Sequence, residues 1–347
     1  MRTATPIEAA KHGTLWKVTE SGLSMGTLKI PSFTARLVRW YIVWIRRAKV
    51  LFASPDNTRN SFQALYLRPQ SFSPPQDLGQ DISINRVDVH EWPLYRVSAD
   101  TGTSGKEARP AMLYVHGGAF FREIDLQHWK FVTQAARDTG LDVLVPIYPL
   151  IPRPTATTEK IAAGLIDICR LSEQRIVCVA GDSAGGHLAL AAAQQMRERQ
   201  PDLAAQLRCL VLISPVLDSA LDHPEVVRLS RDDPWLAIEG LRVLTPFLSG
   251  GLPIQHPAVS PLYGDINHLP PILLLCGTSD MLCGDARRLS ARFQGKDAKE
   301  CMPGSVQLDK FTYVEQADMI HVYPLLPHSE GAEARDLIMS FVRKNVE

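Results

Sequence analysis

Short, uninterrupted apolar runs that alternate with helix-length segments constrain the fold of this chain more than any other feature. Runs of this length rich in Val, Ile and Leu are typical of strands buried on both faces of a sheet. They occur at Ala111–Val115, Val143–Tyr148, Ile176–Ala180, Leu210–Ile213 and Ile272–Cys276. Segments of helical length lie at Gln127–Thr139, Thr157–Ser172, Ala184–Arg199 and Asp285–Phe293. The alternation predicts an α/β fold with a mostly parallel central sheet and helices on both faces.

Other segments extend or interrupt this alternation. Ile82–Val89 alternates apolar with polar residues, and we expect it to pair with Leu94–Ala99 through a turn at Glu91–Pro93. A further strand is expected at Val306–Val314. Residues 216–269 contain no obvious strand but have helix-like pieces around Trp235–Leu248. We therefore divide the chain into an N-terminal helical segment (1–80) and one α/β domain (81–347) with an insertion at 216–269.

Composition excludes several classes of protein. Of the 347 residues 45% are hydrophobic, and 37 basic residues balance 37 acidic ones. This balance argues against a nucleic-acid partner bound through bulk electrostatics. The six cysteines include no CxxC pair, and Met1–Lys17 lacks the apolar run of a secretory signal, so we expect a reducing, cytoplasmic compartment. No His, Cys or Asp spacing resembles a metal site, and neither a metal nor a cofactor is expected.

The strongest chemical signal follows the run Ile176–Ala180. Gly181-Asp182-Ser183-Ala184-Gly185 has the form G-x-S-x-G, a pattern for which only about 0.1 chance matches are expected in a chain of 347 residues. Its place between a strand and a helix is typical of a nucleophile elbow, which lifts a serine hydroxyl above the sheet. The pattern predicts Ser183 as a nucleophile.

A second glycine-rich loop follows the strand Ala111–Val115. His116-Gly117-Gly118-Ala119 matches the loops that lend backbone N–H groups to an oxyanion hole. We assign Gly117 and Gly118 as donors, with the N–H of Ala184 as their partner from the elbow. His116 is interpreted as structural.

A serine nucleophile needs a base and an acid that orients the base, in the chain order Ser, acid, His for this fold. Asp280 follows the strand Ile272–Cys276 and is preferred over Asp285, which is better placed to cap a helix. His321 follows the strand Val306–Val314 and is preferred over His328. Of the other reactive side chains nearby, structural interpretations are favoured for Asp182, His187 and Cys283.

These motifs together resemble the hormone-sensitive-lipase branch of the α/β-hydrolases. The resemblance rests on HGGAF and GDSAGG, on Ser260-Pro261-Leu262-Tyr263 before Leu269-Pro270-Pro271, and on the strand that ends at Asp280. It implies ester hydrolysis by a triad of Ser183, Asp280 and His321, no cofactor, and a helical cap built from residues 1–80 and 216–269. The loop reads HGGA where many members have HGGG, so that Ala119 would supply the third donor.

The expected function is that of a serine carboxylic-ester hydrolase, of the esterase or deacetylase type. Its partner would be a small or medium hydrophobic ester, including an ester of secondary metabolism. Amide, formamide or thioester cleavage, or cyclisation or dehydration on the same scaffold, is the first alternative, because all of these need a base and an oxyanion site. A non-catalytic small-molecule receptor is an alternative of another class, which the presence of His321 disfavours.

An apolar stripe lies near the N-terminus, at Phe33, Leu37, Trp40, Tyr41 and Trp44. Arginines interrupt it, and its longest apolar run is six residues, far short of the roughly 20 that span a bilayer. We expect the stripe to pack on its own domain as part of the cap, while contact with a membrane surface is the less favoured alternative. Trp40 and Trp44 are then candidate substrate-binding residues, together with Phe120.

Overall fold

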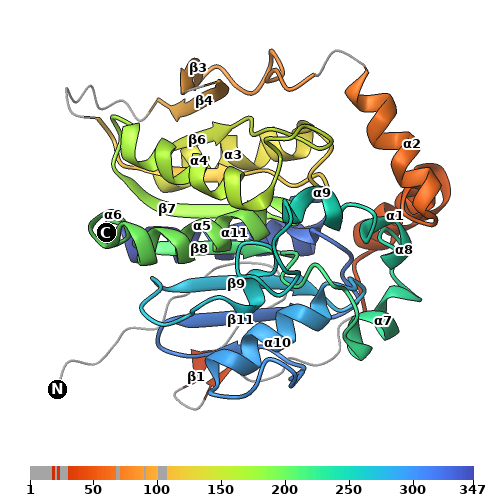
Figure 1. Cartoon of the computed structure of the whole chain (residues 1–347). Coiled ribbons are helices and arrows are strands. Elements are labelled where there is room, and N and C mark those ends of the chain that lie inside the picture. The colour runs from red at the N-terminus through yellow and green to blue at the C-terminus, as the bar shows by residue number, and fades with distance from the viewer. Residues whose placement is uncertain (1–17, 20–21, 24–29, 68–70, 90, 101–107) are drawn as a thin grey trace.

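The computed structural model describes residues 18–19, 22–23, 30–67, 71–89, 91–100 and 108–347. Within these residues nine strands form one mixed sheet (Figure 1). In spatial order they are β10 (Val306–Gln307), β11 (Phe311–Gln316), β9 (Ile272–Gly277), β8 (Cys209–Ile213), β7 (Ile176–Asp182), β5 (Ala111–Val115), β6 (Asp142–Pro146), β4 (Trp92–Ala99) and β3 (Ile82–Val89). The strands from β11 to β6 are parallel, and β10, β4 and β3 are antiparallel to their neighbours. A separate short pair joins β1 (Val18–Thr19) to β2 (Gly22–Leu23).

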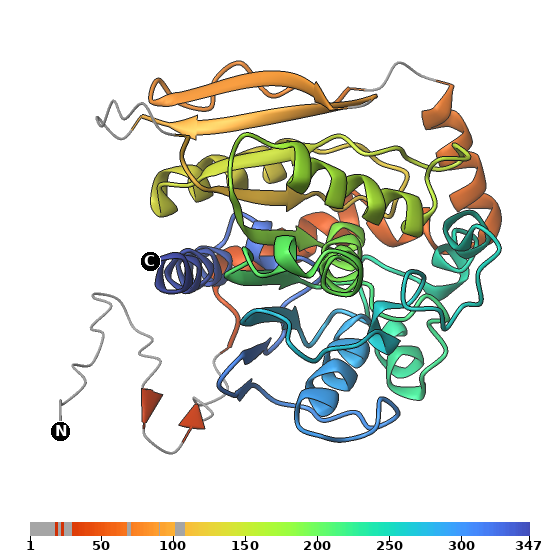
Figure 2. The same ribbon diagram turned by 60° about the vertical axis from the view of Figure 1, so that its left-hand side comes forward.

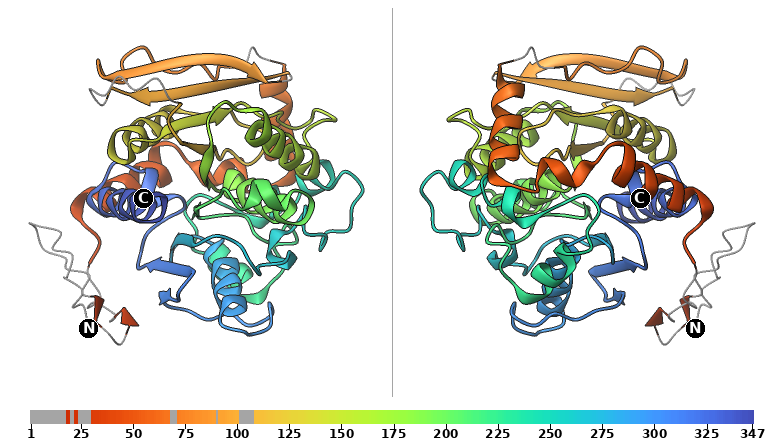
Figure 3. Two further views of the ribbon diagram at one scale, coloured as in Figure 1. Left: turned by 90° about the vertical axis from the view of Figure 1, so that its left-hand side faces the viewer. Right: turned by 90° about the vertical axis from the view of Figure 1, so that its right-hand side faces the viewer.

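Helices cover both faces of the sheet. On one face lie α3 (Leu126–Thr139) and α11 (Ser329–Val346), and on the other lie α4 (Thr158–Leu171), α5 (Ala184–Arg199) and α10 (Cys283–Phe293) (Figures 2 and 3). A short helix, α6 (Pro201–Ala204), follows α5. The expected fold class, a mostly parallel sheet between two helical layers, is confirmed.

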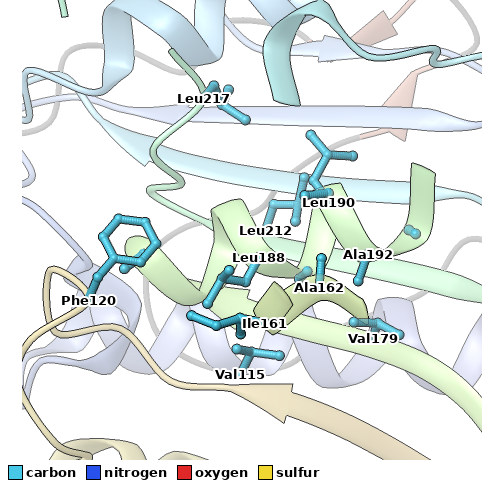
Figure 4. Close-up of a cluster of buried hydrophobic side chains, with 14 of the residues drawn as sticks. Val115, Phe120, Ile161, Ala162, Val179, Leu188, Leu190, Ala192, Leu212 and Leu217 are labelled. Atoms are coloured by element: carbon cyan, nitrogen blue, oxygen red, sulfur yellow. The ribbon is translucent and has the colours of Figure 1, made fainter. Parts of the chain in front are cut away.

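The central strands are apolar throughout because both of their faces are buried. In β5, Leu113 and Val115 join the core on the side of α4 and α5, whereas Met112 and Tyr114 join the core on the side of α3 and α11. Figure 4 shows the first of these cores, in which side chains of β5, β7 and β8 meet those of α4 and α5. This two-sided burial explains why the strands read as continuous apolar runs rather than as alternating ones.

Two expected elements are divided in the structure. The strand expected over Val306–Val314 is a hairpin, in which Val306 of β10 pairs with Tyr313 of β11. The polar residues Asp309 and Lys310 lie in the turn, where their side chains need no place in the core. The helical piece expected around Trp235–Leu248 is two short helices, because Pro246 can begin a helix but cannot continue one.

The N-terminal segment and the insertion pack against each other. They contain α1 (Phe33–Trp40), a π-helical turn (Tyr41–Ile45), a 3₁₀ turn (Ala48–Leu51), α2 (Pro55–Tyr66), α7 (Pro224–Ser230), α8 (Ile238–Leu241) and α9 (Thr245–Ser249). The N–H of Gly240 in α8 donates to the carbonyl of Phe52 at 2.9 Å, and an added Cβ at Gly240 would meet Phe52. Figure 1 shows these helices gathered on one side of the molecule.

The expectation that the aromatic stripe packs on the domain is wrong for most of its surface. Phe33, Trp40 and Trp44 are 71%, 51% and 68% exposed. The helix packs instead through Ala35 and Ile42, which lie on its opposite side. Small and aliphatic side chains allow the closer approach, so the aromatic side is left facing outward. Among the described residues no helix combines the length and the apolar character that crossing a bilayer demands.

The close approach of α5 to β5 gives a test of the packing. An added Cβ at Gly185 would collide with the carbonyl oxygen of Val115 and lie 2.5 Å from that of His116. We expect Gly185→Ala to lower the free energy of unfolding by about 3 kcal/mol or more, because no rotamer change relieves a clash with backbone. At Gly140, where φ is +70° and the space is open, the alanine variant should cost only about 1 kcal/mol. Urea denaturation of both variants measures the difference, and equal costs would contradict this account.

Candidate active site

Ser183 lies in a tight turn between β7 and α5. Its backbone has φ 52° and ψ −116°, a conformation that a residue other than glycine rarely adopts. The turn is closed on both sides, because the N–H of Ser183 donates to Ile213 and its carbonyl accepts from Val216. Strain of this kind is retained where the surroundings fix a side chain in a required position. The hydroxyl of Ser183 is thereby held at the carboxyl edge of the sheet.

The structure brings Ser183, His321 and Asp280 together. The Nε2 atom of His321 lies 2.9 Å from the Oγ atom of Ser183, and its Nδ1 atom lies 2.9 Å from Oδ2 of Asp280. All three side chains are buried. They follow the ends of β7, β11 and β9, respectively. Ser183 and His321 are 138 residues apart in the chain. With Nδ1 donating to the carboxylate, Nε2 is free to accept the proton of the serine hydroxyl.

The electrostatic surroundings of His321 favour its charged form. Burial by itself would lower the pKa of His321. The carboxylate of Asp280 and its hydrogen bond outweigh burial, and Asp233 adds to them, so that the pKa is raised above its ordinary value of 6.5. A histidine that is stabilised when protonated can hold the proton taken from Ser183.

The two rival residues lie elsewhere. Asp285 lies in the first turn of α10 and pairs with Arg288 at 2.7 Å, rather than capping the helix as expected. Burial raises the pKa of Asp285 to about 7. His328 is the N-cap of α11, where its ring accepts from the N–H of Gly331. Among the described residues, neither side chain forms a hydrogen bond with His321 or Ser183.

The glycine-rich loop differs from the expectation at Gly117. The N–H of Gly117 donates to Oδ1 of Asp182 at 2.9 Å, so it points away from the nucleophile and is not a donor to an oxyanion. Gly118 and Ala119 border the same cavity as Ser183, whereas Gly117 does not. Gly118 and Ala119 have φ values of 117° and 53°, so the backbone makes a tight turn here and does not continue as a strand. Gly118 and Ala119 remain the candidate donors of this loop. Ala184 lies at the first position of α5, where an N–H has no partner within the helix, and is the candidate donor from the elbow.

Asp182 anchors this loop, a role that the sequence pattern did not reveal. Besides Gly117, it accepts a hydrogen bond of 2.6 Å from the hydroxyl of Tyr114, and Nε2 of His128 lies 3.4 Å away. Burial opposes a charge on His128, but the carboxylates of Asp182 and Asp125 outweigh it and raise the pKa of His128 to about 10. The acidic residue of the GDSAG motif therefore holds the neighbouring loop through its hydrogen bond to Gly117, and a buried ion pair joins the same carboxylate to His128 of α3.

The remaining reactive side chains contact parts of the fold outside the triad. His116 stacks on Tyr148 with ring centroids 4.6 Å apart, and burial lowers its pKa to about 4. His187 lies near the carbonyls of Val216 and Ala258, and burial lowers its pKa to about 4 as well. Cys283 contacts the hydroxyl of Tyr313 behind the site.

A cavity of about 540 Å³ opens beside Ser183 and His321. Its wall is largely apolar and is formed in part by Leu37, Trp40, Tyr41, Phe52, Trp235 and Leu325. Trp40 therefore borders the cavity, whereas the expectation for Trp44 is wrong, because this side chain points outward and does not line it. Trp44 lies one turn beyond Trp40, on the side of the helix opposite the buried Ile42, so its ring faces outward.

A second, smaller cavity of about 30 Å³ also reaches Ser183. Phe120 lines this cavity rather than the larger one, and the other walls include Leu221, Leu241, Leu244 and Leu248. Four of these side chains come from the insertion, so the insertion closes the site on this side.

Trp235 and Asp233 were not foreseen. The ring of Trp235 meets that of His321 edge to face, with centroids 5.8 Å apart. Asp233 is buried and accepts hydrogen bonds from the N–H groups of Trp235 and Met281 at 2.7 and 2.8 Å. It thus joins the insertion to the turn that carries Asp280. The only sequence signal was the Asp-Pro-Trp run, which by itself indicates a turn. Among the described residues no group of three or more His, Cys, Asp or Glu side chains is placed to hold a metal.

Comparison with known proteins agrees with this geometry. Residues 112–323 match the family model described as alpha/beta hydrolase fold. An acetyl-hydrolase of Streptomyces hygroscopicus is 30% identical over 239 residues, which cover 67% of this chain and 75% of that protein. A triacylglycerol lipase of Mycobacterium tuberculosis is 35% identical over 176 residues, which cover 50% of this chain and 35% of the lipase.

Solved structures give the same result. An esterase of the bacterial hormone-sensitive lipase family superimposes with a TM-score of 0.67 at 26% identity, covering 92% of this chain and all of that one. The chain spans less than two thirds of the length of several curated relatives that it matches. The family match covers more than half of this chain and includes both glycine motifs and all three residues of the hydrogen-bonded triad. The protein belongs to the α/β-hydrolase fold family and resembles its hormone-sensitive-lipase branch.

Proposed function

We propose that this protein is a serine carboxylic-ester hydrolase with a Ser183–His321–Asp280 triad. The observation that carries the proposal is the chain of two hydrogen bonds of 2.9 Å that ends at a cavity of about 540 Å³. Such an arrangement has the nucleophile, base and orienting acid that acyl transfer to water requires. The names of the relatives, esterase and acetyl-hydrolase, support the same activity.

In the proposed mechanism, Oγ of Ser183 attacks the ester carbonyl while Nε2 of His321 takes the hydroxyl proton. The carbonyl oxygen becomes an oxyanion, which the N–H groups of Gly118, Ala119 and Ala184 stabilise. The C–O bond to the alcohol then breaks, and His321 gives its proton to the leaving alcohol. Water repeats the sequence on the acyl-enzyme and releases the acid, and Asp280 keeps the imidazole in the required tautomer throughout.

We assign the small cavity to the acyl group and the large cavity to the alcohol. One water molecule needs about 10–15 Å³ of such space. The small cavity of about 30 Å³ therefore accommodates only a few heavy atoms. The large cavity has room for a bulky, mainly apolar alcohol. Glu123 lies in the wall of the large cavity, and burial raises the pKa of its carboxyl group to about 7. The proposed substrate is therefore a short-chain acyl ester of a medium-sized hydrophobic alcohol, for which a specialised metabolite is one source.

The triad is tested by substitution and labelling. Ser183→Ala should abolish both turnover and labelling by a fluorophosphonate. Asp280→Asn should lower kcat by about 10⁴, because the imidazole loses the acceptor that fixes its tautomer. Asp285→Asn is the matched control, an aspartate five residues away that should leave kcat of the folded enzyme within about tenfold. Intact wild-type protein that resists labelling would contradict the proposal and favour a receptor.

The acyl pocket is tested by a chain-length series of p-nitrophenyl esters. We expect kcat/KM to be highest for acyl groups of about two to four carbons and to fall by about tenfold or more for eight carbons, because longer chains exceed the cavity. Leu244→Ala should move the optimum to longer chains. Leu289→Ala is the control, because Leu289 is as buried as Leu244 but lines neither cavity. Both variants should lower the free energy of unfolding by about 2–5 kcal/mol. An unchanged optimum in Leu244→Ala would refute the assignment of the acyl pocket.

The pH dependence tests the role of Asp233. Activity should rise with pH as His321 loses its proton, because only the neutral ring can act as the base. Asp233→Asn removes a negative charge that raises the pKa of His321, so the rising limb of kcat/KM should move to lower pH. The neighbouring, exposed Asp232→Asn should leave the limb in place. A limb that moves to higher pH in Asp233→Asn would contradict this electrostatic role.

A further inference from the structure

The N-terminal helix has two apolar sides, of which only one is used by the fold. Ala35 and Ile42 are buried against the domain, where Ile42 joins a small cluster with Ile320 and Leu326. On the opposite side lie side chains that are between 47% and 71% exposed, namely Phe33, Leu37, Trp40, Tyr41 and Trp44. We call these five residues the aromatic face. A contiguous exposed apolar surface of this kind is typical of a site that another surface covers.

The charges within the helical segment that carries the aromatic face have one sign. Residues 30–54 contain four arginines and one lysine and no aspartate or glutamate, although the chain as a whole is neutral. Arg36, Arg46 and Arg47 are exposed, whereas Lys49 is engaged with the carbonyl of Ser230 at 2.8 Å. Aromatic side chains flanked by arginines on one helix are the combination that anionic lipid surfaces attract.

The aromatic face is continuous with the entrance to the active site. Leu37, Trp40 and Tyr41 are about half exposed, and they also line the cavity of about 540 Å³ that contains Ser183. A surface that covers the aromatic face therefore lies at the mouth of this cavity. An apolar molecule that leaves such a surface would reach the cavity without crossing water.

We propose that the aromatic face docks the protein on an anionic lipid surface, with the cavity opening toward the lipid. The charges argue against a second copy as the occupant, since a two-fold contact through this face would bring two sets of arginines together. This docking does not depend on hydrolysis, so its failure would leave the proposed enzymatic activity untouched.

Sedimentation with vesicles tests the docking. The wild-type chain should pellet with phosphatidylcholine vesicles that contain about one third phosphatidylglycerol, and binding should fall by about tenfold or more with pure phosphatidylcholine. Salt near 0.5 M, where the Debye length is roughly 4 Å, should weaken binding to the anionic vesicles. Phe33→Ser with Trp44→Ser removes two aromatics that do not line the cavity, and should lower the partition coefficient by about tenfold or more.

Charge is tested in the same assay. The triple variant Arg36→Gln, Arg39→Gln and Arg47→Gln should lower binding by roughly fivefold for each arginine near the surface. Matched controls carry the same kinds of change elsewhere on the exposed surface: Leu171→Ser with Ile254→Ser, and Arg86→Gln with Arg170→Gln and Arg199→Gln. These controls should bind as the wild type does. Circular dichroism melting of every variant checks that it is folded.

Two results would overturn the proposal. The first is wild-type protein that stays in the supernatant with anionic vesicles, or folded face variants that bind as tightly as the wild type. The second comes from light scattering after size exclusion. Suppose that the wild type is a dimer, that the variant Phe33→Ser with Trp44→Ser is a monomer, and that the wild type does not bind vesicles. A second copy of the chain then covers the aromatic face instead of lipid.

Discussion

The close contact between the start of α5 and the end of β5 is the constraint on which the site depends. Gly185 has no side chain, and this lets the helix approach the carbonyl groups of Val115 and His116. The turn before it then holds Ser183 in a conformation with positive φ. Because β5 continues directly into the glycine-rich loop His116–Ala119, the same contact fixes the distance between Ser183 and the proposed N–H donors. A small change at this contact would displace both Ser183 and the proposed N–H donors.

Buried ion pairs and hydrogen bonds then set the orientation of each reactive group. Asp280 holds the ring of His321, while Asp182 holds the glycine-rich loop at Gly117. The two carboxylates have different partners and different effects. Asp280 raises the pKa of the proposed base, His321, whereas Asp182 pairs with His128. Asp233 connects the turn that carries Asp280 to the insertion, because it accepts a hydrogen bond from the N–H of Met281. The insertion is thus more than a cover, because it also contributes charge and a contact to the triad.

Much of the fold and of the candidate site could be predicted because both are encoded locally. The strands of the parallel sheet are buried on two faces, which requires short apolar runs that can be seen without any alignment. A nucleophile elbow requires glycines at fixed spacing around Ser183. The choice of Asp280 over Asp285 used the end of a strand, which is also a local feature. The assignment of Gly117 as a donor failed because the orientation of its N–H depends on Asp182, which lies 65 residues away.

The sequence by itself determined the alternation of strands and helices in the central part of the fold, the three residues that the structure joins by hydrogen bonds, and the apolar stripe of residues 33–44, since each follows from residue types at short spacing. Only the tertiary structure decided which side of the N-terminal helix is buried, since both of its sides are apolar and close packing favoured the small residue Ala35. It also decided the two cavity volumes and the place of Trp235 beside His321. These features arise where segments distant in the chain meet, and the physical reason is that packing between such segments selects one arrangement from several that the local pattern permits.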